Sequence, residues 1–230
     1  MAKERKRLRA WSWPLIAAAA LLSAAEDASA QGFYAGLHGG LNITHDGDVD
    51  EFFFFDSTTV GRARYDSGSA VGGSLGYKSP SSWRLELEAT YRRNAFDKID
   101  WSHFSKIGSF ETTGDVASLA FMANVFWDID TGTKWTPSLG AGLGVVQVTF
   151  DDVSDADGPL FDETETGVGF QMGIGVGYAL TEALTLSLDY RFFVAFVSPT
   201  ADLGQPGIGG EEFNMEYTNS AFLLGLRYQF

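Results

Sequence analysis

The residues whose chemistry could support catalysis are few in this chain of 230 residues. It contains three histidines, His38, His45 and His103, and no cysteine, which excludes a thiol nucleophile, a disulfide framework and a cysteine-ligated metal. Neither His45 nor His103 has a serine-nucleophile motif of the form G-x-S-x-G near it. Asp97 and Asp100 precede His103 and could pair with it as an acid–base group. Because no nucleophile accompanies them, the sequence predicts that the protein is not an enzyme.

Carboxylates gather in two polar stretches, and oxygen ligands of this kind are those that Ca²⁺ and Mg²⁺ prefer. One stretch carries Asp46, Asp48, Asp50 and Glu51, and the other carries Asp151, Asp152, Asp155, Asp157, Asp162, Glu163 and Glu165. An EF-hand loop is excluded, because Val153 stands where the first ligand belongs and Thr164 where the bidentate glutamate belongs. The sequence therefore predicts acidic surface loops, with no defined metal site and no cofactor. The formal net charge of -14 also argues against a nucleic acid partner.

The segments that position such residues are clearest at the end of the chain, in residues 221–230. Phe222, Leu224, Leu226, Tyr228 and Phe230 share one parity, whereas Gly225, Arg227 and Gln229 fall on the other. Successive side chains of a β-strand point to opposite faces, so this alternation predicts a strand with one apolar and one polar face. Such a strand either covers a soluble core or faces lipid on one side and a barrel lumen on the other.

The same alternation occurs in seven earlier segments, at 32–44, 69–77, 83–93, 115–127, 135–150, 167–180 and 183–194, and the last strand begins near residue 217. Short connectors at 78–82, 128–134 and 181–182 alternate along the chain with long ones at 45–68, 94–114, 151–166 and 195–216. An even number of antiparallel strands with short turns at one end and long loops at the other is typical of outer-membrane barrels. The sequence therefore predicts an all-β fold, an eight-stranded antiparallel transmembrane up-and-down β-barrel.

The polar faces of these strands decide which side of the barrel meets lipid. They carry charges of both signs: Arg84, Glu86, Glu88, Arg92, Asp189, Arg191 and Arg227. A lipid-facing arginine costs about 2–4 kcal/mol at the membrane midplane, whereas charges inside a narrow barrel can pair. A soluble lipocalin-like barrel needs the opposite arrangement, with an apolar interior and a polar exterior. We therefore predict that these residues form a luminal charge network.

Residues 1–30 have the composition of a secretory signal peptide. Five basic residues within residues 3–9 precede a short apolar run at 14–25, and Ala28-Ser29-Ala30 offers a cleavage site. The apolar run is shorter than the roughly 20 residues that a spanning helix needs, which argues against the alternative of an uncleaved N-terminal anchor. The sequence thus predicts a cleaved signal peptide at 1–30 and an outer-membrane β-barrel domain at 31–230.

On these features the chain resembles the small eight-stranded outer-membrane β-barrel proteins, the porin-family or opacity-protein-like domain related to the OmpA transmembrane domain. The resemblance spans residues 32–230 and is carried by motifs in a fixed order: Phe33-Tyr-Ala-Gly-Leu-His-Gly-Gly40, Leu85-Glu-Leu-Glu88, Met122-Ala-Asn-Val-Phe-Trp-Asp128, Gly140-Ala-Gly-Leu-Gly144, Gly175-Val-Gly-Tyr-Ala-Leu-Thr181, Leu188-Asp-Tyr-Arg191 and Leu224-Gly-Leu-Arg-Tyr-Gln-Phe230. It implies a location in the outer membrane of a Gram-negative bacterium, in contact with lipid and lipopolysaccharide.

The resemblance also implies that the terminal pattern of Phe222, Leu224, Leu226, Tyr228 and Phe230 is the assembly signal read by the barrel-assembly machinery. The expected role is structural, with acidic surface loops that support envelope integrity and interact at the surface with an unknown extracellular ligand. Two alternatives stay open: a small porin-like channel for small solutes, and a barrel enzyme that modifies lipid A.

Three arginines are candidates for contact with lipopolysaccharide. Arg93 falls on the lipid-facing parity just beyond Tyr91, and Arg62 and Arg64 lie near the top of the neighbouring strand. Guanidinium groups form strong charge-assisted hydrogen bonds with phosphate. We therefore predict that these arginines contact lipopolysaccharide phosphates.

Overall fold

The computed structural model describes residues 32–53, 56–103, 106–156, 158–197, 200–201 and 211–230. Its strands are β1 (Phe33–Thr44), β2 (Gly47–Phe53), β3 (Asp56–Tyr65), β4 (Gly68–Lys78), β5 (Trp83–His103), β6 (Lys106–Glu111), β7 (Thr113–Asp128), β8 (Trp135–Asp155), β9 (Gly158–Ala179), β10 (Leu184–Val197), β11 (Thr200–Ala201) and β12 (Glu211–Gln229). None of these residues belongs to a helix that is long and apolar enough to cross a membrane. The predicted signal peptide lies outside the described residues and stays a prediction.

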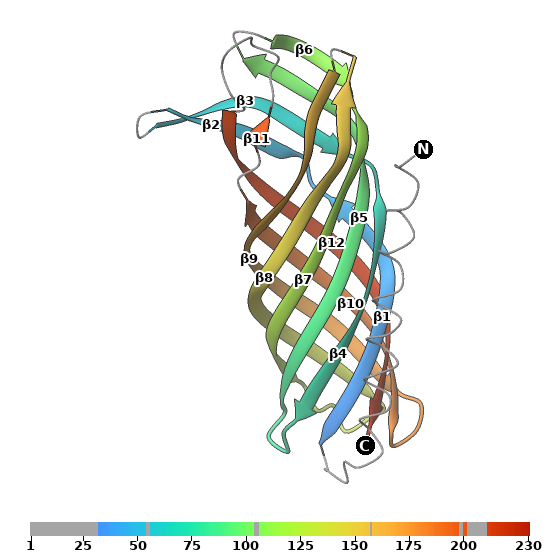
Figure 1. Cartoon of the computed structure of the whole chain (residues 1–230). Coiled ribbons are helices and arrows are strands. Elements are labelled where there is room, and N and C mark those ends of the chain that lie inside the picture. The colour runs from blue at the N-terminus through green and yellow to red at the C-terminus, as the bar shows by residue number, and fades with distance from the viewer. Residues whose placement is uncertain (1–31, 54–55, 104–105, 157, 198–199, 202–210) are drawn as a thin grey trace, which may run out of the picture.

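Eight of these strands close into a ring (Figure 1). β1 pairs with β4, β4 with β5, β5 with β7, β7 with β8, β8 with β9, β9 with β10, β10 with β12, and β12 returns to β1, all antiparallel. The closing pair runs from Tyr34 opposite Gln229 to Thr44 opposite Asn219. Closure leaves no unpaired sheet edge to face lipid. The predicted all-β, eight-stranded antiparallel up-and-down barrel is therefore confirmed.

The prediction of four long loops is wrong over much of their length, because strands run through them. β5 and β8 are each 21 residues long and β9 has 22. Apolar residues of these segments point inward and polar neighbours point outward: Phe96 of β5 and Val153 of β8 are buried, whereas Asp97 and Asp152 beside them are exposed. A strand that has left the lipid is surrounded by water, so its apolar residues turn inward. The sequence prediction looked for strands whose apolar residues face lipid, so it assigned these segments to loops.

The hairpin of β2 and β3 carries the ring beyond the ends of β1 and β4 (Figure 1). β2 pairs with β12, where Val49 lies opposite Met215, and β3 pairs with β5, where Ala63 lies opposite Ile99. The wall of β1 thus continues into β2 after a break at residues 45–46, and β3 continues into β4 after a break at 66–67. We call the part built from β2, β3, β6 and the adjoining ends of the long strands the distal extension.

An apolar core fills the distal extension and reaches down into the barrel to Met122, which lies opposite Glu88 in the β5–β7 register. Its buried members are Ala63, Phe96, Ile99, Val116, Ala120, Met122, Val146, Val148, Phe150, Val153, Leu160, Phe193, Ala195, Val197 and Tyr217. Tyr65 and Phe110 pack against this cluster from its margin. Removing apolar area from water contributes about 25 cal/mol per Å², so this core stabilises the extension as it would stabilise a soluble domain.

Below the extension the outward face of the barrel is apolar and exposed. On β8 this face runs from Trp135, which is 53% exposed, to Val145, which is 55% exposed. This span of about 11 residues is what a tilted strand needs to cross a bilayer. The aromatic pairs Phe33–Tyr77 and Trp135–Tyr178, with ring centroids 5.1 and 4.6 Å apart, lie at the end with the short turns, where such side chains suit a membrane interface.

Candidate functional site

The barrel interior gathers most of the charges that the sequence assigns to the lumen. Arg84, Glu86, Glu88 and Arg92 come from β5, Asp189 and Arg191 from β10, and Arg227 from β12. Each lies on the parity opposite its lipid-facing neighbours, so strand pleating alone turns them inward. Arg84, Glu86, Glu88, Arg92 and Arg191 are all at most 6% exposed. Charges buried to this degree are stable only when they are paired or well hydrogen-bonded.

Glu88 is the acceptor at the centre of the upper part of this interior. Its Oε2 accepts hydrogen bonds from Arg191 Nη1 at 3.2 Å, Asn124 Nδ2 at 3.1 Å and Gln171 Nε2 at 3.4 Å. Its Oε1 accepts from Thr90 Oγ1 at 2.7 Å. Side chains from four strands, β5, β7, β9 and β10, therefore form hydrogen bonds with this one carboxylate.

Arg84 is the donor at the centre of the lower part. Its Nε lies 3.2 Å from Asp128 Oδ1, and its Nη1 donates to Glu86 Oε2 and to the Tyr34 hydroxyl oxygen, each at 3.1 Å. The Tyr34 hydroxyl in turn donates to Glu86 Oε2 at 2.6 Å. The guanidinium also stacks over the Phe126 ring at 4.3 Å from its centroid.

Asp128 was missed by the sequence prediction, which placed it in the turn at 128–134. The structure places it at the end of β7, 4% exposed and paired with Arg84. Its parity is that of Asn124 and Phe126, which also face the lumen. Extending the alternation of β7 by one residue was the signal that could have found it.

Among the residues that the structure describes, two of the predicted luminal arginines form no ion pair within this network. Arg227 lies with its guanidinium 6.0 Å from the centroid of the Tyr34 ring. Arg92 lies 4.4 Å over the Phe193 ring. Arg191 instead bridges the two halves, since its Nη2 lies 3.9 Å from Glu86 and 4.0 Å from Asp189 in addition to the Glu88 contact of Nη1.

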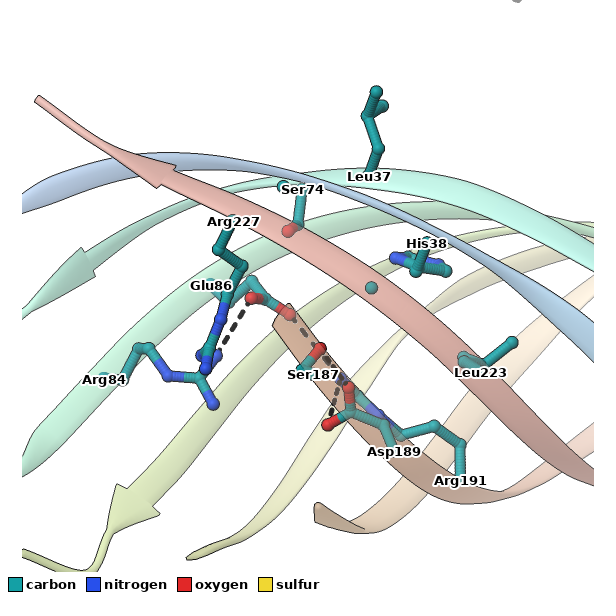
Figure 2. Close-up of a pocket in the computed structure, with 12 residues that line it drawn as sticks. Leu37, His38, Ser74, Arg84, Glu86, Ser187, Asp189, Arg191, Leu223 and Arg227 are labelled. Atoms are coloured by element: carbon teal, nitrogen blue, oxygen red, sulfur yellow. Dashed lines mark hydrogen bonds and ion pairs between the residues drawn. The ribbon is translucent and has the colours of Figure 1, made fainter. Parts of the chain in front are cut away.

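A small cavity lies beside these ion pairs (Figure 2). It has a volume of about 20 Å³ and is lined by polar and charged side chains that include Arg84, Glu86, Asp189, Arg191 and Arg227. A volume of this order holds roughly one water molecule. The interior above it is occupied by the apolar core of the distal extension.

The histidines differ in their surroundings. His38 faces the lumen, where its Nε2 lies 2.9 Å from Thr90 Oγ1. His45 lies outside the barrel wall with its Nε2 2.8 Å from Ser220 Oγ, a contact that the sequence prediction missed because the two residues are far apart in the chain. The Ser220 hydroxyl is also 2.9 Å from the Tyr190 hydroxyl and is largely buried. The side chain of His103 lies outside the described residues.

Residues 72–76 match the G-x-S-x-G pattern, with Ser74 at its centre. In lipases and esterases that motif works because the serine sits on a sharp strand-to-helix turn. Here Ser74 lies in the middle of β4, buried and facing the lumen. Ser74 therefore does not form the nucleophile elbow that this motif forms in those enzymes.

The acidic stretch at 151–166 forms part of the β8–β9 hairpin rather than a loop. Within the described residues, Asp151, Asp152 and Asp162 bring carboxylate oxygens within 4.8 Å of one another. All three side chains are exposed, as solvated carboxylates commonly are.

The three arginines predicted to contact lipopolysaccharide do not form one cluster. Arg64 Nη2 lies 2.9 Å from Asp100 Oδ2, and Arg62 lies opposite Asp100 in the β3–β5 register. Arg93 lies farther down β5, with Nη2 2.7 Å from Asp115 Oδ2 on the outer surface. Hydrogen bonds from Ser109 and Arg64 hold the pKa of Asp100 below its ordinary value, so the Arg64 pair persists until the pH falls through that lowered pKa.

The residues of the predicted assembly signal lie along the outer face of β12. Phe222, Leu224, Leu226 and Tyr228 are all exposed on the apolar band, and Phe230 packs edge-on against Tyr228 with ring centroids 5.5 Å apart. The backbone N–H of Phe230 donates to the carbonyl of Phe33, which ties the last residue to the first strand. Their reading by the assembly machinery stays a prediction.

Known proteins are similar to this chain in sequence. Residues 15–230 match the family model of the outer membrane protein beta-barrel domain. The outer membrane protein PagN of Salmonella typhimurium is 22% identical over 236 residues, which covers 94% of this chain and 96% of PagN. An uncharacterized protein of Brucella abortus is 27% identical over 167 residues, and the match covers 63% of this chain and 56% of that protein.

Two solved structures have a similar fold. The outer membrane protein OprG from Pseudomonas aeruginosa superposes with a TM-score of 0.56 at 15% identity, covering 87% of this chain and 98% of OprG. The outer membrane protease OmpT from Escherichia coli superposes with a TM-score of 0.52 at 9% identity, covering 86% of this chain and 97% of OmpT. At such identities the likeness concerns the fold alone. Because the family model matches most of the chain, this protein belongs to the outer membrane protein beta-barrel domain family, whose members reside in the outer membrane of Gram-negative bacteria.

Proposed function

We propose that this protein is a closed structural barrel of the outer membrane whose distal extension presents an acidic surface outside the cell. In this role it supports the integrity of the envelope and offers a surface for contact with extracellular partners. The observation that carries the proposal is the filled interior, with the Arg84 and Glu88 networks below and an apolar core above. A barrel closed at both levels stabilises the membrane without passing solute through it.

The alternative of a porin-like channel is disfavoured by the same contents. Eight strands enclose an interior just wide enough for side chains. Opening a path requires breaking buried ion pairs such as Arg191–Glu88 and displacing buried residues such as Phe150. Each of these steps costs several kcal/mol.

Planar-bilayer conductance of the refolded mature barrel tests this proposal. We expect no stable single-channel steps, after the shift in gel mobility on heating has established that the barrel is folded. Gly225 lines the cavity, so Gly225→Leu serves as the matched variant that narrows the lumen further. Steps in the wild type that Gly225→Leu abolishes would contradict the closed barrel and favour the channel.

Contact with lipopolysaccharide is part of the proposed role, and Arg93 is the best placed of the predicted arginines. Its guanidinium lies on the outer surface next to the apolar band, and its side chain is 47% exposed. We expect Arg93→Ala to lower the amount of lipopolysaccharide that copurifies with the barrel by a factor of about two to five, as for an exposed charged contact of roughly 0.5–1 kcal/mol. Lys134→Ala, in an exposed turn at the other end, is the control. Equal retention by both variants would remove Arg93 from the proposal.

The alternative of a lipid A modifying enzyme has one observation in its favour, the His45–Ser220 contact on the lipid-facing side. Against it, the Ser220 hydroxyl is shared with Tyr190 and shielded from the surroundings. A nucleophilic serine needs an accessible oxygen and a base held by a third group. We therefore propose a role without catalysis and expect the copurified lipid A to have unchanged mass. A loss of acyl chains that depends on Ser220 would contradict this.

A further inference from the structure

Arg92 occupies the boundary between the charged interior and the apolar core. It lies on β5 opposite Ser118 of β7 and Ala70 of β4, and its side chain is fully buried. The Phe193 ring covers one face of its guanidinium, 4.4 Å away. A guanidinium keeps its charge at all physiological pH values, so this position holds a permanent positive charge.

Within the described residues, none of the three nitrogens of Arg92 has a hydrogen-bond partner. Arg84 and Arg191, in the same lumen, each bind carboxylates. The carboxylate with the strongest electrostatic influence on Arg92 is Glu88, but its oxygens already accept four hydrogen bonds from other donors. Arg92 is therefore attracted to a carboxylate that it does not contact.

The side chains around Arg92 also offer several buried hydrogen-bond donors. Among the described residues, the Ser118 hydroxyl, the Tyr217 hydroxyl and the Asn219 amide nitrogen make no hydrogen bond of good geometry, although Tyr217 is close enough to Ser118, Thr44 and Asn219 for weak ones. Ser118, Tyr217 and Asn219 are each at most 1% exposed. Tyr217 lies within electrostatic reach of Arg92 and beside Ser118 and Asn219. Two buried amide oxygens, of Asn42 and Gln171, are likewise unpartnered, but they are neutral.

We propose that Arg92, Ser118, Tyr217 and Asn219 bind one small monovalent anion of the size and charge of chloride inside the barrel. Burying a charge away from water is costly unless an opposite charge accompanies it, and an anion supplies both that charge and several acceptor directions at once. A water molecule offers acceptors but no charge. The apolar core above Arg92 offers no acceptor, and the Glu88 oxygens below it already accept four hydrogen bonds from other donors.

Such an anion would join β5, β7 and β12 at the floor of the distal extension. Binding to the folded state alone raises stability with ligand concentration, so the barrel should respond to the identity of the salt. We expect the refolded barrel to unfold about 2–5 °C higher in sodium chloride or bromide than in sodium gluconate of equal ionic strength. The measurement is the midpoint of the heat-induced shift in gel mobility.

Arg92→Met should abolish this difference between salts, whereas Lys134→Met, which removes a charge in an exposed turn, should retain it. A crystal grown in bromide should show an anomalous peak within hydrogen-bond distance of the Arg92 guanidinium. The peak is a test on the wild type, so the proposal can be judged even if Arg92→Met fails to fold. Equal midpoints in halide and gluconate, together with density for water alone at Arg92, would overturn it.

Discussion

Replacing Glu88 by alanine should lower the free energy of unfolding by about 3–5 kcal/mol, the cost of leaving buried partners of an ion pair without their counter-charge. Glu88 accepts from Arg191, Asn124, Gln171 and Thr90, so the substitution strips acceptors from four side chains at once. The strands that carry these donors come from opposite parts of the ring. The loss should therefore weaken the whole barrel rather than one hairpin.

Equilibrium unfolding in urea, with the barrel in lipid vesicles and followed by tryptophan fluorescence, measures this change. The matched control is Glu182→Ala, which removes an exposed glutamate from the turn between β9 and β10 and should alter stability by less than about 0.5 kcal/mol. Glu88→Gln keeps the shape but not the charge, and its effect should fall between the two. If Glu88→Ala lowered the free energy of unfolding by less than about 1 kcal/mol, the luminal ion pairs would be solvated and would contribute little to stability.

Replacing Phe150 by alanine should destabilise the distal extension by about 3–5 kcal/mol, because it removes a large side chain from a packed core and leaves a cavity. Phe150 is fully buried and lies 6.4 Å from Phe96 between ring centroids. It sits beyond the membrane-facing band, so the membrane-embedded ring should persist. We therefore expect local opening of the extension.

Digestion with a protease added from outside to intact cells or oriented vesicles measures that opening. Cleavage within the extension should accelerate by roughly a hundredfold or more, since about 1.4 kcal/mol corresponds to a factor of ten in the open population. Ile107→Ala is the control, because that side chain is 77% exposed on the β5–β6 hairpin and supports no core. If Phe150→Ala and Ile107→Ala are cleaved at the wild-type rate, the extension is not a packed body.

The interior of the barrel was predictable to the extent that it depends on parity. In residues 83–93 the alternation places Arg84, Glu86, Glu88 and Arg92 on one face, since neighbouring side chains of a strand point in opposite directions. That face is buried in the structure. The alternation could not predict which of these charges form ion pairs. Glu88 accepts a hydrogen bond from Arg191, which is 103 positions away in the chain, and this contact depends on the stagger of the eight strands around the ring.

The distal extension was not predictable from the same alternation. The stretch from Val146 to Phe150 was included in a strand, but the strand continues to Asp155 because its inward residues find an apolar core contributed by other strands. A single sequence carries no sign of that core until the strands are assembled. The hairpin of β2 and β3 was unpredictable for the same reason, because its strands pair with β12 and β5, which are distant in the chain.

The sequence by itself determined the all-β fold, the number of membrane-crossing strands and the side of each strand that faces lipid. These follow from a period of two residues, which is a local property of an extended chain. Only the tertiary structure decided which charges pair, that Arg92 is left without a partner among the described residues, and that predicted loops become walls. These depend on register and on the stagger of the closed ring, which bring distant residues to one level of the barrel.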